Sequence, residues 1–326
     1  NLPATLGADA PYENMGTIQT KGWELAIDYR HTFKNGLHFG VTASVADDKT
    51  EVTKWTYNTK IPSYGATGWW DKSAYKEGMV LGDIWGLQFD RFLTEDDFNA
   101  DGSLKAGLPD QTKVFPAGYQ FAPGDVLYKD LDNNGEIVKQ TNTNDKGDLS
   151  VIGNALPRLQ FGLNLDAAWK GFDISMFFQG VAKRKLWAAG NQVLPGFTTG
   201  EPFYKGAEDY WTPENTDAFY PRPMDYKQSA SGNYSVNDRY LLNMAYLRLK
   251  TFTVGYSLPK VWLSKFKVQG LRVYFTGENL FTIDGVKPAI DPEIGIRTAS
   301  GKSDQRNFGR SYPYQKTVSF GIQLSL

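Results

Sequence analysis

Hydrophobic and polar side chains alternate along several stretches of this chain. Between Trp23 and Phe33 the odd-numbered positions are mostly apolar, and the even-numbered positions are polar or small. A period of two places successive side chains on opposite faces of an extended chain, which predicts a β-strand. The alternation resumes from Leu37 to Ala46 after the tight-turn sequence Lys34-Asn35-Gly36. We therefore predict a hairpin of two strands, each longer than the usual five or six residues.

The same alternation predicts five further strands, at 159–170, 172–179, 245–258, 271–276 and 317–326. A short turn at Gly171 joins the first two of these segments. Within 245–258 the apolar parity changes near Lys250-Thr251, which predicts a β-bulge there. The chain is therefore predicted to be all-β, with seven long antiparallel strands.

The connections between these strands alternate between short turns and very long segments. The long ones cover residues 49–156, 188–242 and 284–312. Loops of this length are uncommon inside a compact soluble domain. Tight turns at one end and long loops at the other are typical of outer-membrane β-barrels, in which the long loops are extracellular. We therefore expect these three segments to be extracellular loops.

In a membrane, the two sets of alternating side chains on each strand, here called the apolar and the polar column, would face different surroundings. In a bilayer every backbone polar group must be paired within the protein, so a spanning sheet must close into a barrel. The apolar column then faces lipid, and the polar column faces a wet lumen. Complete bacterial barrels have at least eight strands. We therefore interpret the chain as the C-terminal part of a larger barrel, with residues 1–20 as a loop remnant.

Composition narrows the function further. With 35 basic and 36 acidic residues the net charge is −1, which argues against nucleic-acid binding. The chain has no cysteine and only two histidines, so thiolate chemistry, histidine-rich zinc sites and most Ser-His-Asp arrangements are not expected. Carboxylate pairs such as Asp291 and Glu293 occur, but nothing in the sequence places two of them across a cleft. No enzymatic activity is expected.

Short motifs occur in a specific order along the chain. They include Lys21-Gly22-Trp23-Glu24, Gly124-Asp125, Ile152-Gly153-Asn154-Ala155-Leu156-Pro157, Tyr210-Trp211-Thr212-Pro213-Glu214-Asn215, Tyr246-Leu247-Arg248-Leu249-Lys250 and Gly277-Glu278-Asn279-Leu280-Phe281. In this order and spacing the chain resembles the C-terminal barrel region of SusC/RagA-type TonB-dependent transporters of Bacteroidetes outer membranes. The resemblance spans nearly all 326 residues.

The resemblance implies a barrel of 22 strands, of which this chain would supply the last seven. It implies TonB-driven import of a glycan or peptide through the bacterial outer membrane, in contact with outer-membrane lipid. The implied partners are a SusD-like surface lipoprotein and TonB, the latter acting through an N-terminal region and plug that this chain lacks. A dimer of transporter–lipoprotein pairs is a further implied assembly. The terminal Leu326 departs from the aromatic residue that often ends such barrels.

One loop motif suggests a cation site. Asp130, Asp132 and Asn134 would supply side-chain oxygens and Glu136 its backbone carbonyl, with a glycine at the sixth position, as in the first half of a calcium loop. The twelfth position is Thr141 in place of the usual glutamate, and Asp145 or Asp148 is available to complete the shell. The motif therefore predicts Ca²⁺ bracing the loop. The alternative is an Asx-rich turn without an ion.

Tryptophans in the first long loop are the candidate substrate contacts. Trp69, Trp70 and Trp85 carry broad faces that can stack on sugar rings or pack against peptide side chains. Further aromatic candidates, around the second long loop, are Trp187, Tyr204, Tyr210 and Trp211. The alternative is that such rings form small cores inside the loops. Charged residues on the polar columns, such as Arg248 and Arg272, are interpreted as a solvated interior wall with paired charges.

A soluble β-rich glycan-binding module or adhesin is the competing interpretation of the whole chain. Alternating apolar and polar faces also fit a β-sandwich. A sandwich would bury its apolar columns against a second sheet, whereas a membrane wall would leave them uncovered by protein. The position of these columns therefore discriminates between the two interpretations.

Overall fold

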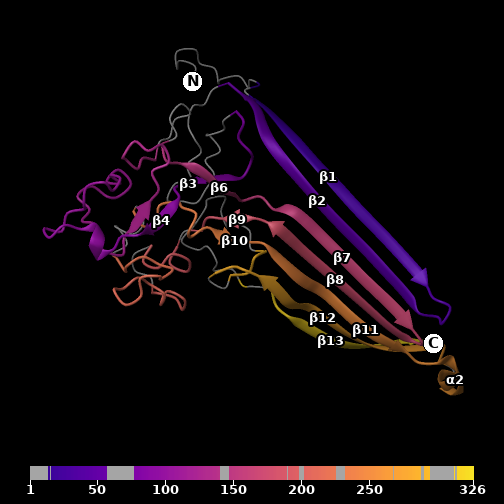
Figure 1. Cartoon of the computed structure of the whole chain (residues 1–326). Coiled ribbons are helices and arrows are strands. Elements are labelled where there is room, and N and C mark those ends of the chain that lie inside the picture. The colour runs from indigo at the N-terminus through magenta and orange to yellow at the C-terminus, as the bar shows by residue number, and fades with distance from the viewer. Residues whose placement is uncertain are drawn as a thin grey trace, which may run out of the picture.

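One seven-stranded antiparallel sheet dominates the chain (Figure 1). The computed structural model describes residues 14, 16–56, 77–139, 147–188, 190–197, 202–224, 232–266, 268–287, 290–293, 312 and 314–326. The strands neighbour one another in the order β1-β2-β7-β8-β11-β12-β13. Their bounds are β1 Gly16–Thr32, β2 His38–Trp55, β7 Arg158–Trp169, β8 Phe172–Lys183, β11 Tyr246–Ser257, β12 Gly270–Asp284 and β13 Thr317–Ser325. The seven predicted strands are confirmed.

Two tight turns connect neighbouring strands at the narrow end of the sheet. In the first, Gly36 has a φ of +80° and the Leu37 amide donates to Asn35 Oδ1 at 3.1 Å. In the second, Lys170 and Gly171 both have positive φ, and Trp169 pairs directly with Phe172. Positive φ at both central positions is what a two-residue hairpin needs to match the twist of its strands. A short helical connection, α2 (Lys260–Leu263) with η3 (Ser264–Phe266), lies at the same end (Figure 1).

The predicted irregularity in β11 is confirmed. The register shifts between Leu249 and Thr251 in the pairing with β8 and again in the pairing with β12. One extra residue at this point keeps Leu249 and Phe252 in the same apolar column although they are three positions apart. The bulge therefore explains the parity change seen in the sequence.

The first hairpin is longer than the alternation predicted. β1 begins at Gly16, inside the predicted loop remnant, and β2 runs to Trp55, inside the first predicted loop. The added segments are mostly polar, and their few apolar residues, such as Ile18 and Val52, do not form an alternating series, so hydrophobic alternation could not mark them. Their pairing, with Thr20 opposite Thr50, continues the ladder without a break up to a register shift near Thr17.

The long connections form a layer of loops at the opposite end of the sheet from the tight turns (Figure 1). This layer contains three small ribbons, which the sequence analysis did not predict. β3 (Asp83–Gly86) pairs with β6 (Ser150–Asn154), β4 (Phe89–Phe92) with β5 (Val126–Tyr128), and β9 (Lys185–Leu186) with β10 (Leu242–Asn243).

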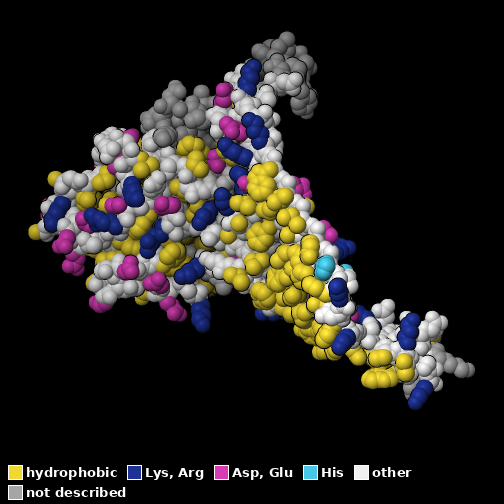
Figure 2. All heavy atoms as spheres, turned by 45° about the vertical axis from the view of Figure 1, so that its right-hand side comes forward, with side chains coloured by type: hydrophobic (Ala, Val, Ile, Leu, Met, Phe, Trp, Pro, Cys, Tyr) yellow, Lys and Arg dark blue, Asp and Glu magenta, His cyan; other side chains and the backbone are white. Residues whose placement is uncertain are grey.

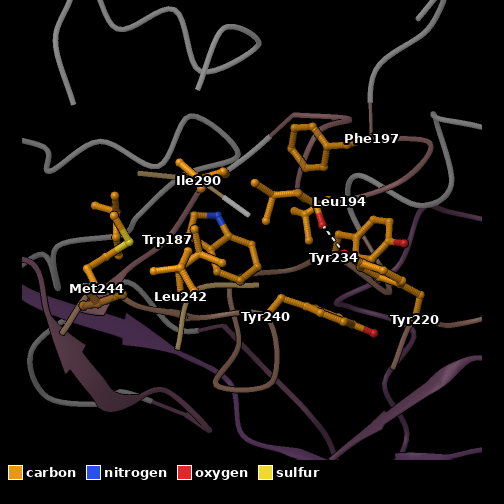
Figure 3. Close-up of a cluster of buried hydrophobic side chains, with 14 residues drawn as sticks. Trp187, Leu194, Phe197, Tyr220, Tyr234, Tyr240, Leu242, Met244 and Ile290 are labelled. Atoms are coloured by element: carbon orange, nitrogen blue, oxygen red, sulfur yellow. Dashed lines mark hydrogen bonds between the residues drawn. The ribbon is translucent and has the colours of Figure 1, made fainter. Parts of the chain in front are cut away.

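The loop layer has its own hydrophobic interior. One cluster gathers around Trp187, Leu194 and Tyr240, and Figure 3 shows these side chains pointing toward one another from separate stretches of the connection between β8 and β11. A second cluster gathers around Leu87 and Tyr128. All five side chains are 2% exposed or less. The loops are therefore a folded cap, which we call the loop cap, held by packing in the same way as a small domain.

The apolar columns of the long strands lie uncovered. In β1 the side chains of Trp23, Leu25, Ile27 and Tyr29 are each more than 50% exposed, and the same holds for Phe320 and Ile322 in β13. Figure 2 shows the apolar side chains gathered in a continuous band between the loop cap and the tight-turn end. Among the described residues, the sheets other than the seven-stranded one are two-stranded ribbons of the loop cap. No second sheet therefore covers this band within that part of the chain.

Helices in the described part of the chain are short, and none combines the length and apolar character required to cross a membrane.

Candidate functional site

The motif beginning at Asp130 forms a compact acidic turn in the loop cap. Asp130 Oδ2 accepts a hydrogen bond from the Gly135 amide at 2.8 Å, and Asp132 Oδ1 accepts one from the Asn134 amide at 3.1 Å. Gly135 and Asn133 both have positive φ, at 84° and 57°. These side chain–backbone bonds are those of an Asx-rich turn, so the turn is formed without help from an ion.

Asp148 joins this turn from the other side. Its carboxylate is fully buried and accepts hydrogen bonds from the amides of Leu131 and Val138, both at 2.7 Å. Carboxylate oxygens of Asp130, Asp132 and Asp148 lie within 4.8 Å of one another. Of the two residues suggested to complete the cation shell, Asp148 is therefore in place. Asp145 lies outside the described residues, as does Thr141.

The remaining predicted ligands have other contacts. Asn134 Oδ1 accepts a hydrogen bond from the Glu136 amide at 2.7 Å, and the Glu136 side chain pairs with Lys113. Desolvation and the neighbouring charges of Asp148 and Asp130 raise the pKa of Asp132. A hard cation would relieve this repulsion, because it would be shared by the three carboxylates. Calcium binding at this turn stays a prediction.

Of the three predicted substrate contacts, the structure describes one, Trp85. Trp69 and Trp70 lie outside the described residues. Trp85 lies in β3 and packs against the second hydrophobic cluster of the loop cap. This position is the one that the alternative interpretation, a core inside the loops, describes. A role for Trp85 in substrate contact stays a prediction.

A buried ion-pair cluster ties the third long connection to the polar face of β11. Arg248 Nη2 lies 2.7 Å from Asp291 Oδ1, and its Nη1 lies 3.1 Å from Glu293, at an angle outside hydrogen-bond geometry. Lys250 Nζ donates to Glu293 Oε2 at 2.7 Å. The side chains of Arg248 and Asp291 are each 4% exposed. Breaking one partner of such a buried pair leaves an uncompensated charge, so the cluster holds the loop firmly against the strand.

Other charges on the polar face of the sheet are also paired, as predicted. Arg272 reaches across β11 to Asp173 of β8, with Nε donating to Oδ1 at 3.0 Å. It passes over Gly255, where an added Cβ would lie 2.5 Å from the guanidinium. The glycine is thus required for the close approach of the side chain to the strand, because any larger residue would displace it.

A second buried network, which the sequence analysis missed, joins distant parts of the loop cap. Asp125 is fully buried and accepts hydrogen bonds from Arg222 Nε at 2.8 Å, Tyr119 Oη at 2.9 Å and Asn233 Nδ2 at 3.0 Å. Burial and the adjacent Asp125 charge raise the pKa of Tyr119. Tyr119 is six residues from Asp125, but Arg222 and Asn233 are 97 and 108 residues away along the chain, so no local pattern could have revealed this network.

Comparison with known proteins gives the chain a context. No family model matches it. It is 26% identical to TonB-dependent receptor P3 of Formosa agariphila over 99% of its own length and 30% of the receptor's. It is 22% identical to TonB-dependent receptor SusC of Bacteroides thetaiotaomicron over 96% of its own length and 27% of that protein's. The chain therefore spans about three tenths of the length of these relatives.

Solved structures agree with this resemblance. A structure described as the RagAB peptide transporter superposes with a TM-score of 0.60 at 19% identity, covering 99% of this chain and 31% of that one. The RagAB peptide importer in its open-open state superposes with a TM-score of 0.62 at 18% identity, covering all of this chain and 30% of that one. The resemblance to SusC/RagA-type transporters is confirmed, and the seven strands have the fold of part of such a barrel. These relatives are named receptors and transporters, not enzymes.

Proposed function

We propose that the chain forms part of the wall and the loop cap of a TonB-dependent transporter that imports a bulky nutrient, a glycan or a peptide, across a bacterial outer membrane. The names of the relatives support TonB-dependent import. The RagAB structures, whose descriptions name a peptide importer, support an oligomeric nutrient of that size class.

The observation that carries this proposal is the exposed apolar band on one face of the sheet (Figure 2). Soluble monomers rarely expose a contiguous apolar patch larger than a few hundred Å². Side chains such as Leu25, Ile27, Phe320 and Ile322 would be costly in water but are stable against lipid tails. The opposite face carries paired charges such as Arg272–Asp173, which suit a wet lumen.

The two faces of the sheet and the loop cap would each have a different role in the transporter. The apolar face lies in lipid, the polar face lines the passage, and the loop cap stands on the extracellular side. A SusD-like lipoprotein would close over the loop cap, and two such transporter–lipoprotein pairs would form a dimer. TonB would act through a region outside this chain. The residues of this chain would bind the nutrient and exclude lipid from the passage, and no covalent step is proposed for them.

The experiment that tests the proposal is an uptake assay in the source bacterium. Deleting the gene should abolish accumulation of one class of labelled oligosaccharide or oligopeptide, and plasmid-borne copies should restore it. Restored uptake should also stop when TonB is deleted. Uptake that persists without TonB would reject the mechanism. Unchanged uptake of every tested nutrient in the deletion strain would reject the import function.

The competing function, a soluble binding module or adhesin, makes the opposite physical prediction. It would fractionate in water without detergent. A barrel should fractionate with the outer membrane. It should also migrate faster on gels when unheated, because a closed sheet resists unfolding by the detergent and stays compact. The uncovered apolar band favours the barrel over the sandwich.

A further inference from the structure

A pocket opens in the loop cap, and its described lining residues come from 195, 203–210, 220–223 and 234. Its volume is about 610 Å³. This volume is within the range of ligand pockets and is large enough for several bulky side chains. The pocket lies apart from the acidic turn at Asp130 and from Trp85, none of which lines it.

The floor of this pocket is rigid and apolar. Tyr220 and Tyr234 are 5% and 4% exposed and also belong to the hydrophobic cluster around Trp187 (Figure 3). The Tyr220 hydroxyl donates to the Val193 carbonyl at 2.9 Å, so it is already paired within the protein. Burial raises the pKa of Tyr220 to about 12, and that of Tyr234 is raised in the same way, so both phenols stay neutral.

The rim of the pocket carries exposed aromatic rings. Phe203 is 63% exposed and Tyr210 is 40% exposed. Lys205 and Glu208 also line the pocket, and supply one cationic and one anionic group. Exposed rings above a rigid apolar floor are poised to close on an apolar group, since each ring loses unfavourable contact with water when covered.

From this geometry we infer that the pocket is a specificity site for oligopeptides, and that it takes a bulky apolar or aromatic side chain of the peptide. Lys205 and Glu208 at its edge would pair with backbone carbonyl and amide groups of the same peptide. The inference rests on the proposed import function, because it assigns the substrate class to a site in the loop cap of the importer.

The chemistry of the lining favours a peptide over a glycan. A sugar ring stacks on an aromatic face but also needs several planar polar side chains to pair with its hydroxyls. Among the described residues that line the pocket, Glu208 is the one planar polar side chain, and there is no Asn, Gln, Asp, Arg or His. A buried sugar would leave hydroxyl groups unpaired, at a cost that an apolar side chain does not incur.

The test measures binding to the intact transporter, purified in detergent with any bound partner. The probe is a capped Gly-(4-fluoro-phenylalanine)-Gly tripeptide observed by ¹⁹F NMR. Phe203→Ser and Tyr210→Ser each remove a ring at the exposed rim, where the fold does not depend on it. Trp262→Ser is the matched control, since Trp262 is 61% exposed and lies in α2, at the opposite end of the sheet.

We expect each rim substitution to raise the Kd of the probe at least fivefold, and the Trp262 variant to bind like the unmodified protein. Unlabelled capped Gly-Phe-Gly should displace the probe, and capped Gly-Ser-Gly should not. Unchanged affinity in both rim variants, or displacement of the probe by maltotriose, overturns the inference.

The binding assay needs neither TonB nor an energised membrane, so its failure is separable from that of the proposed function. Absent probe binding together with intact TonB-dependent uptake of a nutrient rejects the peptide site alone. Rim-dependent probe binding in a protein whose deletion leaves uptake unchanged supports the site and rejects the import function.

Discussion

The carboxylate of Asp97 fixes the local structure of one loop almost unaided. It accepts hydrogen bonds from both terminal nitrogens of Arg91, at 2.5 and 2.7 Å, and from the Thr94 amide at 2.8 Å. These contacts hold the start of the short helix η2 (Glu95–Asp97). The Arg91 guanidinium is the main reason that the pKa of Asp97 is lowered to about 2. A paired, bidentate carboxylate of this kind contributes more than an ordinary surface ion pair.

The lowered pKa predicts how this loop responds to acid. Because the folded-state pKa lies below the ordinary value of about 3.9, the stabilisation is fully present above pH 4 and is lost as the pH falls toward 2. We expect Asp97→Asn to remove roughly 1–2 kcal/mol of local stability at neutral pH. Hydrogen exchange of the 91–98 segment, corrected for intrinsic rates, measures both effects. Equal protection in the variant at pH 7 would contradict the argument.

The acidic turn makes a second prediction at this scale, on ligand addition. A loop of this type with incomplete ligands should bind Ca²⁺ with a Kd of about 10⁻⁴–10⁻³ M. Addition of about 10 mM Ca²⁺ should therefore stabilise the 130–139 segment by roughly 1–3 kcal/mol, reversibly with EGTA. Hydrogen exchange checks this, with Asp132→Asn expected to abolish the effect. The exposed Asp217→Asn is the control, and exchange that is insensitive to Ca²⁺ would leave the Asx turn as the full account.

Residue identity alone predicted these sites only in part. The spacing of Asp130, Asp132 and Asn134 was visible in the sequence, and Asp148 was one of two residues suggested to complete the shell. Tyr204 and Tyr210 were among the candidate aromatic contacts, but the pocket itself was missed because its aromatic and proline residues come from separate stretches of the chain. The density of tyrosine and proline between 195 and 234 was the available signal, but periodicity carries no information about which irregular stretches meet.

At the scale of the strands, the proposal makes the two faces unequal in their tolerance of charge. Leu163 of β7 belongs to the apolar column, and Asn164 beside it belongs to the polar column. We expect Leu163→Lys to destabilise the folded wall by roughly 2–4 kcal/mol, because the charge would enter lipid. Asn164→Lys, the matched control on the adjacent residue, should cost much less.

The fraction of protein that resists unfolding on unheated gels, or its urea midpoint in lipid vesicles, measures this difference. Similar losses in the two variants would show that neither face meets lipid, and would favour the soluble alternative.

Strands, hairpin turns and the bulge were predictable because each leaves a local mark in the sequence. The alternation at Trp23–Phe33, the Asn35-Gly36 turn and the parity change beside Lys250 are each visible among residues that are adjacent in the sequence. The ribbons of the loop cap were not predictable, since strands of two to five residues are too short to show a period. The extension of β1 toward Gly16 was missed because its residues do not alternate. A strand of seventeen residues spans roughly 55 Å, which is longer than the apolar band of a membrane barrel, so the outer part of the strand needs no apolar face.

At the scale of the whole molecule, wall and loop cap are stabilised by different means. The wall depends on backbone pairing along seven strands, and the loop cap on two packed clusters and the Asp125 network. The ion pairs of Arg248 with Asp291 and Glu293 are among the contacts that connect them. Two parts with separate interiors should lose structure separately.

A core truncation in the loop cap tests this separation. Leu194 is fully buried in the cluster around Trp187, so Leu194→Ala should destabilise the loop cap by roughly 2–5 kcal/mol. Hydrogen exchange should accelerate in segments 186–197 and 234–244, while the long strands stay protected and gel mobility is unchanged. Leu156→Ala, at a 44% exposed site, is the control. Accelerated exchange throughout β7 and β8 would instead indicate one cooperative unit.

A cap with its own packed interior also bears on how such a protein diversifies. Exposed rim residues such as Phe203 and Tyr210 can be exchanged while the buried tyrosines beneath them keep their packing. Under the proposed import function, substitutions at the rim can change which ligand binds without affecting the lipid-facing wall, and substitutions in the wall need not change the pocket. Natural variation can then explore these two traits largely independently.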